Sequence, residues 1–326
     1  MDILIKPMRI LNTIGTVFSA EALDILNSCG SVDSVDISQK ELLEKVGDYE
    51  IFFLGIGLHL DREVLDRATK LRVIATATTG LDHIDVEYAK QKGVQVISLR
   101  GEDKFLNSIT ATAELACGLM LSVARCIPSA SDSVKNYHWE REQFRGHTVF
   151  GKTLGIVGLG RLGKMMARYG LALGMKVIAF DPYQNKNVFD EIGVAQVSFE
   201  QLIEQSDVVS VHVHLNSETE NLFSQSVFEK MKPESYLINT SRGKIVNEAD
   251  VLSALENKLI AGYATDVLAD EIHFGKTFPS HPLVEYAKEH NNVIIVPHIG
   301  GMTYESREAT DVFMAKKLKK YFEETM

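Results

Sequence analysis

The stretch LGIVGLGRLG at residues 154–163 decides the fold of the chain's second half, because it has the pattern of a strand, a glycine turn and a helix start. In such a turn Gly158 permits the tight reversal and Gly160 lets a phosphate group approach the backbone. Gly163 lets the following helix pack closely on the strand. The helix start offers free N–H groups to a pyrophosphate. The stretch therefore indicates a dinucleotide-binding turn.

The next apolar run ends in an acid that supports this interpretation. Asp181 follows KVIAF at 176–180 and lies 23 residues after Gly158. An acidic side chain about 20 residues beyond the turn bonds the ribose hydroxyls in dinucleotide-binding folds. A carboxylate there would repel a 2′-phosphate, so NAD is favoured over NADP. The alternative is a turn whose glycines only permit packing, with Asp181 a surface acid.

Outward from this turn, short apolar runs alternate with longer helical patterns, which is typical of βαβ units in a parallel sheet. We expect two further long helices at 110–125, which is apolar on most sides, and at 306–323. The chain is thus predicted to have an α/β architecture. The predicted strands are 51–54, 73–77, 94–97, 154–157, 177–180, 208–213, 236–239, 262–266 and 293–296, and the shorter predicted helices are 61–68, 163–173, 199–205 and 247–257.

Length and composition limit the function classes. A chain of 326 residues is about twice the usual domain size, so two domains are expected. With 34 basic against 44 acidic residues the net charge is −10, which disfavours a nucleic-acid partner. No run of 18 uncharged apolar residues and no secretory leader is visible, so we expect no membrane partner. Three cysteines, an odd number, suit a reducing cytoplasm.

Past residue 230 the motifs are specific enough to indicate a family. INTSRG at 238–243, TDV at 265–267 followed by Glu271, and PHIGG at 297–301 resemble the D-isomer-specific 2-hydroxyacid dehydrogenases, as do segments 71–85 and 139–183. The resemblance implies two doubly wound parallel-sheet domains with the active site in the cleft between them. A flavodoxin-like substrate domain would comprise 1–103 and 300–326, and a Rossmann NAD-binding domain 104–299.

By motif position, the resemblance assigns catalysis to Arg242, Glu271 and His298. A histidine, whose ordinary pKa is ~6.5, can exchange the substrate's hydroxyl proton near neutrality, and a neighbouring carboxylate favours its protonated form. Arg242 offers a planar charged fork for the substrate carboxylate and carbonyl. Taken singly, the three could instead be a surface ion pair, a loop acid and a core histidine. Together they predict hydride transfer between NAD(H) and a small D-2-hydroxy acid or 2-keto acid.

Other roles follow from the same resemblance. The loop whose backbone amides would hold the substrate carboxylate is Thr79, Gly80 and Leu81. The residues expected to contact the cofactor are Thr112, Gly158, Gly160, Arg161, Leu162, Gly163, Asp181, His214, Thr240, Ser241, Asp266, Gly300 and Gly301. A homodimer formed through 110–131 is the family expectation.

The sequence departs from the family pattern in two places close to these motifs. Ile272 and His273 follow Glu271 where proline is usual, and His214 also replaces a proline. His212 and His214 would share one face of a strand, as metal ligands do, but no third ligand is evident and no metal is expected.

Two further segments bear on the substrate. The charged stretch 99–107 is longer than usual, and we hypothesise that it helps to set substrate choice, a plain solvated loop being the alternative. Gly55-Ile56-Gly57 stands where members acting on phosphorylated acids often carry arginines, which argues against phosphoglycerate. The chain ends after its closing helix, so we expect a member without a regulatory domain.

Other functions on the same fold remain open at this point. Relatives of the fold serve as NAD-sensing corepressors, and a corepressor-like binding protein is the main alternative to an enzyme. A formate or phosphite oxidiser would need additional site residues that we do not find.

Overall fold

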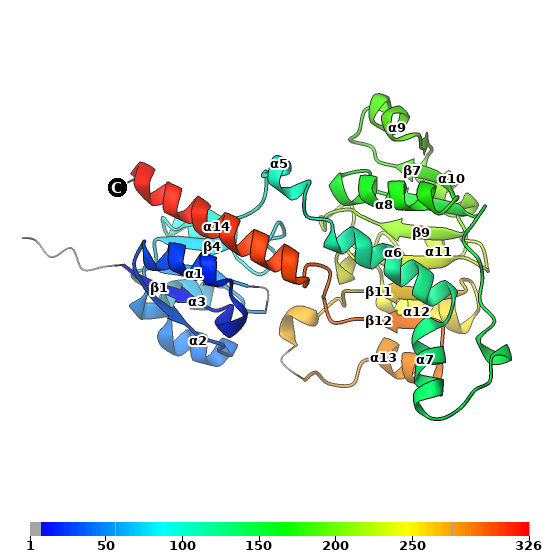
Figure 1. The fold of residues 1–326 in the computed structure, drawn as a ribbon, viewed down its shortest axis with the longest axis horizontal. Helices are drawn as coiled ribbons and strands as arrows, with labels where there is room; N and C mark the ends of the chain where they lie inside the picture. Colours follow the sequence, from blue (N-terminus) through cyan, green and yellow to red (C-terminus); the bar gives the residue numbers. More distant parts are fainter. Residues whose placement is uncertain (1–7, 56, 275–276, 326) are drawn as a thin grey trace, which may run out of the picture. The chain divides into compact units, whose positions relative to one another are not determined.

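The computed structural model describes residues 8–55, 57–274 and 277–325, and the chain divides into two compact units. Unit 1 comprises Met1–Ile109, Ile272–Thr277 and Met302–Met326, and unit 2 comprises Thr110–Glu271 and Phe278–Gly301 (Figure 1). The motifs placed the crossings at 104 and 300, whereas the structure has them at 110 and 302. The assignment of 272–277 to unit 1 was not foreseen from the sequence.

Unit 1 is built around a parallel sheet in the order β2-β1-β3-β4-β5, the flavodoxin-like order. Its strands are β1 (Arg9–Asn12), β2 (Ser31–Ser34), β3 (Ile51–Leu54), β4 (Val73–Thr76) and β5 (Gln95–Ile97). Its helices are α1 (Ala20–Asn27), α2 (Gln39–Lys45), α3 (Arg62–Arg67), α4 (Val86–Gln91), α5 (Asp103–Leu106) and α14 (Tyr304–Thr325), with 3-10 turns η1 (Gly15–Val17) and η2 (Val46–Asp48).

Alternate residues of these strands bury themselves on opposite faces of the sheet, as parallel strands covered on both sides must. Ile51 and Phe53 face α1 and α14, which pack side by side, while Phe52 and Leu54 join the core formed with α2, α3 and α4. Figure 1 shows α14, the last helix of the chain, lying along α1. The end of the chain thus completes the domain that its beginning started.

Unit 2 has a parallel sheet in the order β12-β11-β10-β9-β6-β7-β8, which is the Rossmann order extended by one strand. Its strands are β6 (Thr153–Val157), β7 (Lys176–Phe180), β8 (Ala195–Gln196), β9 (Val208–Val211), β10 (Tyr236–Asn239), β11 (Gly262–Thr265) and β12 (Val293–Ile295). Its helices are α6 (Ala111–Ala124), α7 (Ile127–Lys135), α8 (Arg161–Ala172), α9 (Lys186–Ile192), α10 (Phe199–Gln205), α11 (Gln225–Phe228), α12 (Glu248–Glu256) and α13 (Pro282–Glu289), with 3-10 turns η3 (Glu142–Phe144) and η4 (Gly243–Ile245). The 3-10 turn η5 (Glu271–His273) begins with the last residue of this segment of unit 2 and continues into unit 1.

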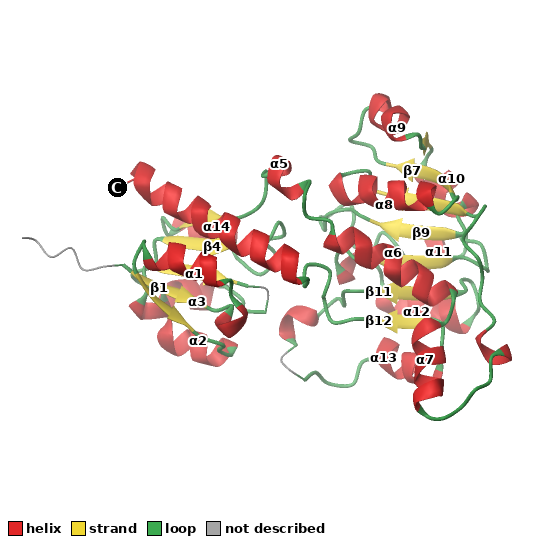
Figure 2. Cartoon of the chain, viewed as in Figure 1, coloured by secondary structure: helices red, strands yellow, loops and turns green. Residues whose placement is uncertain are grey.

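Helix α6 is central to this unit, because it packs against β10, β11 and α8 through Met120, Val123 and their neighbours. Figure 2 shows helices on both faces of the strands. The stretch Asp103–Ala124 also has the length and apolar composition of a membrane-crossing helix, although the sequence led us to expect no such stretch. A helix buried in a protein core meets the same criteria, and α6 contributes seven buried residues to this one.

The doubly wound α/β fold predicted from the sequence is confirmed in both units, and each predicted strand is present to within two residues. The strands missed by the sequence are β1, β2 and β8. Their sequences, RILN, SVDS and AQ, are short or polar, and β2 and β8 lie at sheet edges where a polar face needs no cover. The order of both sheets places a topological switch point where β1 meets β3 and where β6 meets β9.

Candidate active site and cofactor turn

The glycine turn has the geometry that a dinucleotide-binding turn requires. Gly158 has φ +92°, and a Cβ there would come within 2.6 Å of the His212 carbonyl oxygen at the end of β9. A Cβ on Gly163 would lie 2.0 Å from the Gly158 oxygen, so helix and turn meet too closely for any side chain. Gly160 is the N-cap of α8, has no neighbour within 4 Å on its Cβ side, and leaves the helix start without a side-chain cap. The exposed N–H groups of a 12-residue helix therefore fit a pyrophosphate. Arg161 and Leu162, in its first turn, are half-buried.

The Asp181 side chain is hydrogen-bonded to the backbone of the glycine turn. Its Oδ2 accepts a hydrogen bond from Leu159 N at 2.8 Å, and its Oδ1 accepts one from Tyr183 N at 2.9 Å. The carboxylate is thus fixed at the rim of the glycine turn, where the ribose hydroxyls were predicted to bind. Each oxygen has a second lone pair for such a hydroxyl.

Two buried polar atoms at the carboxyl ends of β9 and β10 have no partner among the described residues. Thr240 Oγ1 lies just beyond β10, and His212 Nδ1 lies just beyond β9. Burial lowers the pKa of His212 to about 4, so its ring is neutral, and its Nε2 lies 2.9 Å from Ser210 Oγ. Unpartnered buried groups are costly, so these two atoms point to a polar group that binds here. With the glycine turn they fit NAD.

The other predicted cofactor residues at this edge are arranged differently. Ser241 Oγ donates to Val211 O at 2.8 Å, so this hydroxyl ties β10 to β9. His214 is exposed, and no group of three potential metal-ligating side chains occurs in the described part of the chain.

Asp266 organises the segment 298–300. Its Oδ1 accepts from Ile299 N at 2.6 Å and its Oδ2 from Gly300 N at 2.8 Å, while Thr112 Oγ1 donates to Gly300 O at 3.0 Å. Burial raises the pKa of Asp266 to about 6, against the opposing effect of these two N–H bonds. A carboxyl group that titrates near neutrality and anchors a predicted cofactor loop thus lies at the end of β11. Gly301 is exposed next to it.

Within unit 2 the structure brings the predicted acid–base pair together. His298 Nδ1 lies 2.7 Å from Glu271 Oε1, and the two side chains retain 26% and 19% of their exposure. His298 has φ +52°, a left-handed conformation that is rare for a bulky residue. Its N–H reaches the carbonyls of Asp266 and Val296, and these bonds together with Glu271 hold it there. Such strain concentrates at functional sites.

Arg242 lies in the turn that follows β10. Asn239 organises this turn, and it was not identified from the sequence as a site residue. Asn239 is fully buried; its Nδ2 donates to Arg242 O at 2.9 Å and its Oδ1 accepts from Ser241 N at 3.0 Å. Arg242 is half-buried, and its Nη1 donates to Ser241 O at 2.8 Å. A polar residue that closes an apolar strand was the signal that could have identified Asn239.

In unit 1 the predicted substrate loop follows β4. Thr79, Gly80 and Leu81 are half-buried, and Thr78 Oγ1 donates to Gly80 O at 2.7 Å. Ile84 N donates to Leu81 O at 2.9 Å and so fixes the end of the loop. The loop therefore has a defined backbone without an ionised side chain of its own.

The charged stretch 99–107 is bound to the last helix of unit 1. Leu99 and Leu106 are buried, and Phe105 stacks on Phe313 with ring centroids 4.0 Å apart. Lys317 Nζ lies 2.5 Å from Glu102 Oε1. Arg100 and Lys104 are exposed. The stretch is thus more ordered than a plain solvated loop, and its influence on substrate choice remains a hypothesis.

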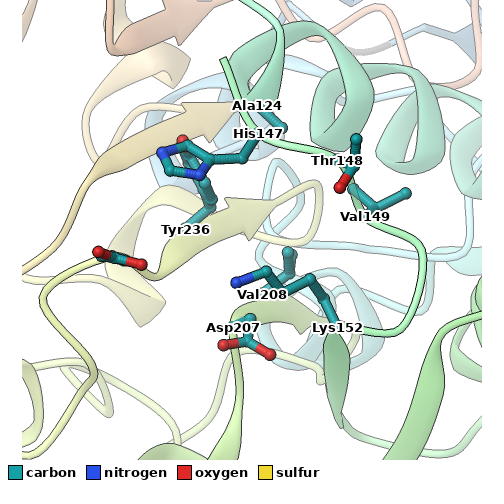
Figure 3. Close-up of a pocket in the computed structure, with 9 residues that line it drawn as sticks. Ala124, His147, Thr148, Val149, Lys152, Asp207, Val208 and Tyr236 are labelled. Carbon is teal, nitrogen blue, oxygen red and sulfur yellow. The ribbon is translucent and has the colours of Figure 1, made fainter.

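A small pocket in unit 2 lies at the amino ends of β6, β9 and β10, whereas the turns described above follow the carboxyl ends of these strands. Figure 3 shows His147 and Tyr236 near one end of it and Lys152 and Asp207 near the other. Its free space, about 10 Å³, is close to the volume one water needs. Asp207 is already bonded to Thr153 N and Lys232. The pocket is too small for a cofactor or substrate.

Comparisons with known proteins agree with this geometry. Residues 117–300 match the family described as D-isomer specific 2-hydroxyacid dehydrogenase, NAD binding domain. The chain is 34% identical over 92% of its length to a D-3-phosphoglycerate dehydrogenase of Methanocaldococcus jannaschii, covering 55% of that protein. It is 36% identical over 85% of its length to a glyoxylate reductase of Thermococcus litoralis, covering 82% of it.

Among solved structures, a D-lactate dehydrogenase from Aquifex aeolicus complexed with NAD and lactic acid superposes with a TM-score of 0.81 at 26% identity, over 97% of this chain and 96% of that one. The chain spans about half the length of the phosphoglycerate dehydrogenases that it matches. These relatives lend no support to the corepressor alternative. The chain belongs to the D-isomer specific 2-hydroxyacid dehydrogenase family, and it contains that family's NAD binding domain.

Proposed function

We propose that this protein is an oxidoreductase that transfers a hydride between NAD(H) and a small D-2-hydroxy acid or 2-keto acid. The observation that carries the proposal is the pair of His298 and Glu271, 2.7 Å apart, on a histidine held in a strained backbone conformation. A histidine that only packs in the core gains nothing from a strained backbone. A histidine that donates a proton must be held in one orientation, and the strained conformation provides that orientation.

His298 would exchange the proton in this reaction. Because its Nδ1 faces Glu271, Nε2 is the nitrogen left for the substrate oxygen. In reduction, the protonated ring gives its Nε2 proton to the carbonyl oxygen as hydride reaches the carbonyl carbon. Glu271 keeps the ring oriented and stabilises its positive charge.

Arg242 would bind the carboxylate and polarise the carbonyl of the substrate. Its guanidinium is always charged and presents parallel donors, which match a 2-keto acid. Bonding to Ser241 O through Nη1 fixes one side of the fork. Thr79, Gly80 and Leu81 would add backbone N–H groups for the same carboxylate.

The bound nicotinamide supplies or receives the hydride. Gly158, Gly160, Arg161 and the start of α8 would hold the pyrophosphate, and Asp181 the ribose. Thr240 and Thr112 would line the nicotinamide side with Asp266. Asp266 also fixes the 298–300 segment, so the positions of cofactor loop and acid–base residue depend on one carboxyl group.

For the substrate we propose an unphosphorylated acid such as glyoxylate rather than a phosphorylated one. Gly55 and Gly57 provide no cation after β3, and the intervening Ile56 lies outside the described residues. A phosphate group is normally recognised by arginine or lysine. The glyoxylate reductase relative supports this choice, and the phosphoglycerate dehydrogenase relatives are the reason to test it.

We further propose a cytoplasmic homodimer, and we place its interface at α7 and the segment after it, which overlaps only the end of the 110–131 region expected from the sequence. This region exposes Tyr137 (98%), Trp139 (86%) and Phe150 (78%), which is unusual for large apolar side chains. None of the residues of α7 is buried. A second copy of the chain would cover this apolar surface, and sedimentation measurements can detect it.

The function is tested by mixing the purified protein with NADH and a panel of glyoxylate, hydroxypyruvate, pyruvate, longer 2-keto acids and phosphohydroxypyruvate. We expect NADH oxidation with at least one unphosphorylated acid. His290→Ala, which changes an exposed histidine at the end of α13, should leave the rate unchanged. Absence of NADH oxidation with every acid in the panel contradicts the proposal.

A further inference from the structure

The residue that follows Glu271 is hydrogen-bonded to a histidine far away in the sequence. His59 Nε2 lies 2.9 Å from the carbonyl oxygen of Ile272, and the ring of His273 is 5.9 Å from that of His59. Ile272 belongs to unit 1, as His59 does, while Glu271 is the last residue of the adjoining segment of unit 2. A contact within unit 1 is therefore one peptide bond away from the carboxylate that orients His298.

His59 is itself held from two directions. The side-chain amide of Gln39 on α2 bonds both backbone groups of His59: Gln39 Nε2 donates to His59 O, and Gln39 Oε1 accepts from His59 N, each at 2.8 Å. The next residue, Leu60, donates its N–H to His83 O and accepts from Asp85 N. Because hydrogen bonds hold the backbone on both sides of His59, the position of its imidazole is restricted.

The residues that bond Leu60 also contact the predicted substrate loop. His83 and Asp85 bond the backbone of Leu60, and Ile84, which lies between them, donates its N–H to Leu81 O in that loop. Hydrogen bonds, together with the peptide links between neighbouring residues, therefore connect the loop 79–81 through Leu60 and His59 to Ile272. One covalent step further is Glu271, and beyond it His298.

Glu271 needs such support, because its own backbone bond is weak. Its N–H reaches Leu268 O only at 3.4 Å, close to the limit for a hydrogen bond, while its side chain accepts from Leu268 N at 3.1 Å. The short 3-10 turn η5 offers little further hold. Ile272 and His273 replace the proline usual in the family, so the rigidity of a proline ring is also missing here.

We infer that His59 is a positioning residue, which fixes Glu271 through the Ile272 carbonyl and thereby sets the orientation of the acid–base pair. The inference rests on the proposed function. His59 touches no reacting atom in this account. Its role is to hold the peptide carbonyl that follows Glu271.

The test compares His59→Ala with His59→Gln, whose amide nitrogen can donate to the same carbonyl. We expect His59→Ala to lower kcat about tenfold while KM for NADH stays unchanged, since a loosened acid–base pair is misplaced but the cofactor turn is intact. His59→Gln should restore kcat.

A matched control is His290→Ala, which also removes a histidine 2.9 Å from a backbone carbonyl, that of Tyr286. It should alter neither kcat nor KM for NADH. If His59→Ala keeps the kcat of the unmodified protein, the inference is wrong. It is equally wrong if His59→Gln is as impaired as His59→Ala, because the role would then not be that of a donor.

A measurement without turnover separates this inference from the proposed function. In protein labelled with ¹⁵N-histidine, the Nδ1 proton that His298 shares with Glu271 can be followed by NMR and assigned with His298→Gln. His59→Ala should speed exchange of that proton, and His59→Gln should not. If the protein is inactive but shows this exchange pattern, the inference about His59 is supported and the proposed function is wrong. Unchanged exchange in His59→Ala overturns the inference whatever the activity.

Discussion

The two units of this protein bury an aspartate each, and the comparison shows how differently they use polar groups. Asp266 in unit 2 accepts two backbone N–H bonds from the 298–300 segment, which carries or adjoins the predicted site residues. Asp311 in unit 1 lies on α14 and pairs with Arg307, 3.3 Å away on the same helix. Burial raises the pKa of both to about 6. One carboxyl group organises a site, whereas the other belongs to helix packing.

The same contrast holds for the loops. In unit 2 the segments after β6, β10 and β12 are held by side chains that reach across strands: Asp181 to Leu159, Ser241 to Val211 and Asp266 to Gly300. In unit 1 the loop 79–81 relies on the hydroxyl of Thr78 and on a local backbone bond. Unit 2 is therefore preorganised for charge recognition, and unit 1 supplies mainly backbone donors. Substitutions in unit 2 should have the larger effects on chemistry.

Arg242→Ala should have the largest effect among the substrate contacts. Loss of charge-assisted bonds to the keto acid should lower kcat/KM about 100-fold, and Arg242→Lys should recover only a part because it cannot form a fork. Steady-state kinetics with the best keto acid measure this. A kcat/KM within twofold of the unmodified protein would show that the substrate carboxylate is bound elsewhere.

Gly163→Ala should damage unit 2 itself. The added Cβ would meet the Gly158 oxygen at 2.0 Å, so the turn must open, with a cost of about 1–3 kcal/mol in the free energy of unfolding and a loss of NADH affinity. Gly118→Ala on α6, where no atom lies within 4 Å of the added carbon, is the matched control and should stabilise the helix. Urea unfolding and NADH fluorescence measure both. Equal effects of the two substitutions would contradict the close approach at the turn.

Asp181→Asn should change cofactor choice with a smaller effect on stability. The amide oxygen can still accept from Leu159 N, but the negative charge that opposes a 2′-phosphate is removed. We expect the preference for NADH over NADPH to fall about tenfold, the equivalent of one charge interaction of ~1.4 kcal/mol. Asp181→Ala should additionally loosen the turn. An unchanged ratio of kcat/KM for the two cofactors would contradict the proposal that Asp181 binds the ribose.

The smallest expected effect is the pH dependence that Asp266 gives to unit 2. Its pKa rises from an ordinary 3.8 to about 6 on folding, so the folded state holds this proton more tightly than the unfolded state. The stability that results is fully present below about pH 4 and is lost as the pH rises through 6, on the order of 1 kcal/mol. Asp266→Asn should flatten this part of the stability profile, as followed by thermal unfolding between pH 4 and 7. Asp311→Asn should do the same for unit 1. A profile unaffected by either change would contradict the raised pKa values.

The sequence predicted unit 2 better than unit 1 for a physical reason. The turn at Gly158, the acid at Asp181 and the motif around His298 are local patterns, in which backbone conformation restricts residue type. Strands β1 and β2 have no such restriction, and their four-residue sequences show no alternation. The bond between His59 and Ile272 joins residues 213 positions apart, and no local pattern announces it. The only local signal for Asn239 was a polar residue that closes an apolar strand, and the turn that it organises is visible only in the fold.

The most direct test of His298 as the proton donor is single-turnover reduction of the preferred 2-keto acid by NADH-loaded protein, compared with His298→Gln. We predict that His298→Gln binds NADH normally and transfers hydride about 10²–10⁴-fold more slowly, the usual contribution of a general acid. A variant that transfers hydride at the rate of the unmodified protein would show that His298 and Glu271 are not the proton-donating pair.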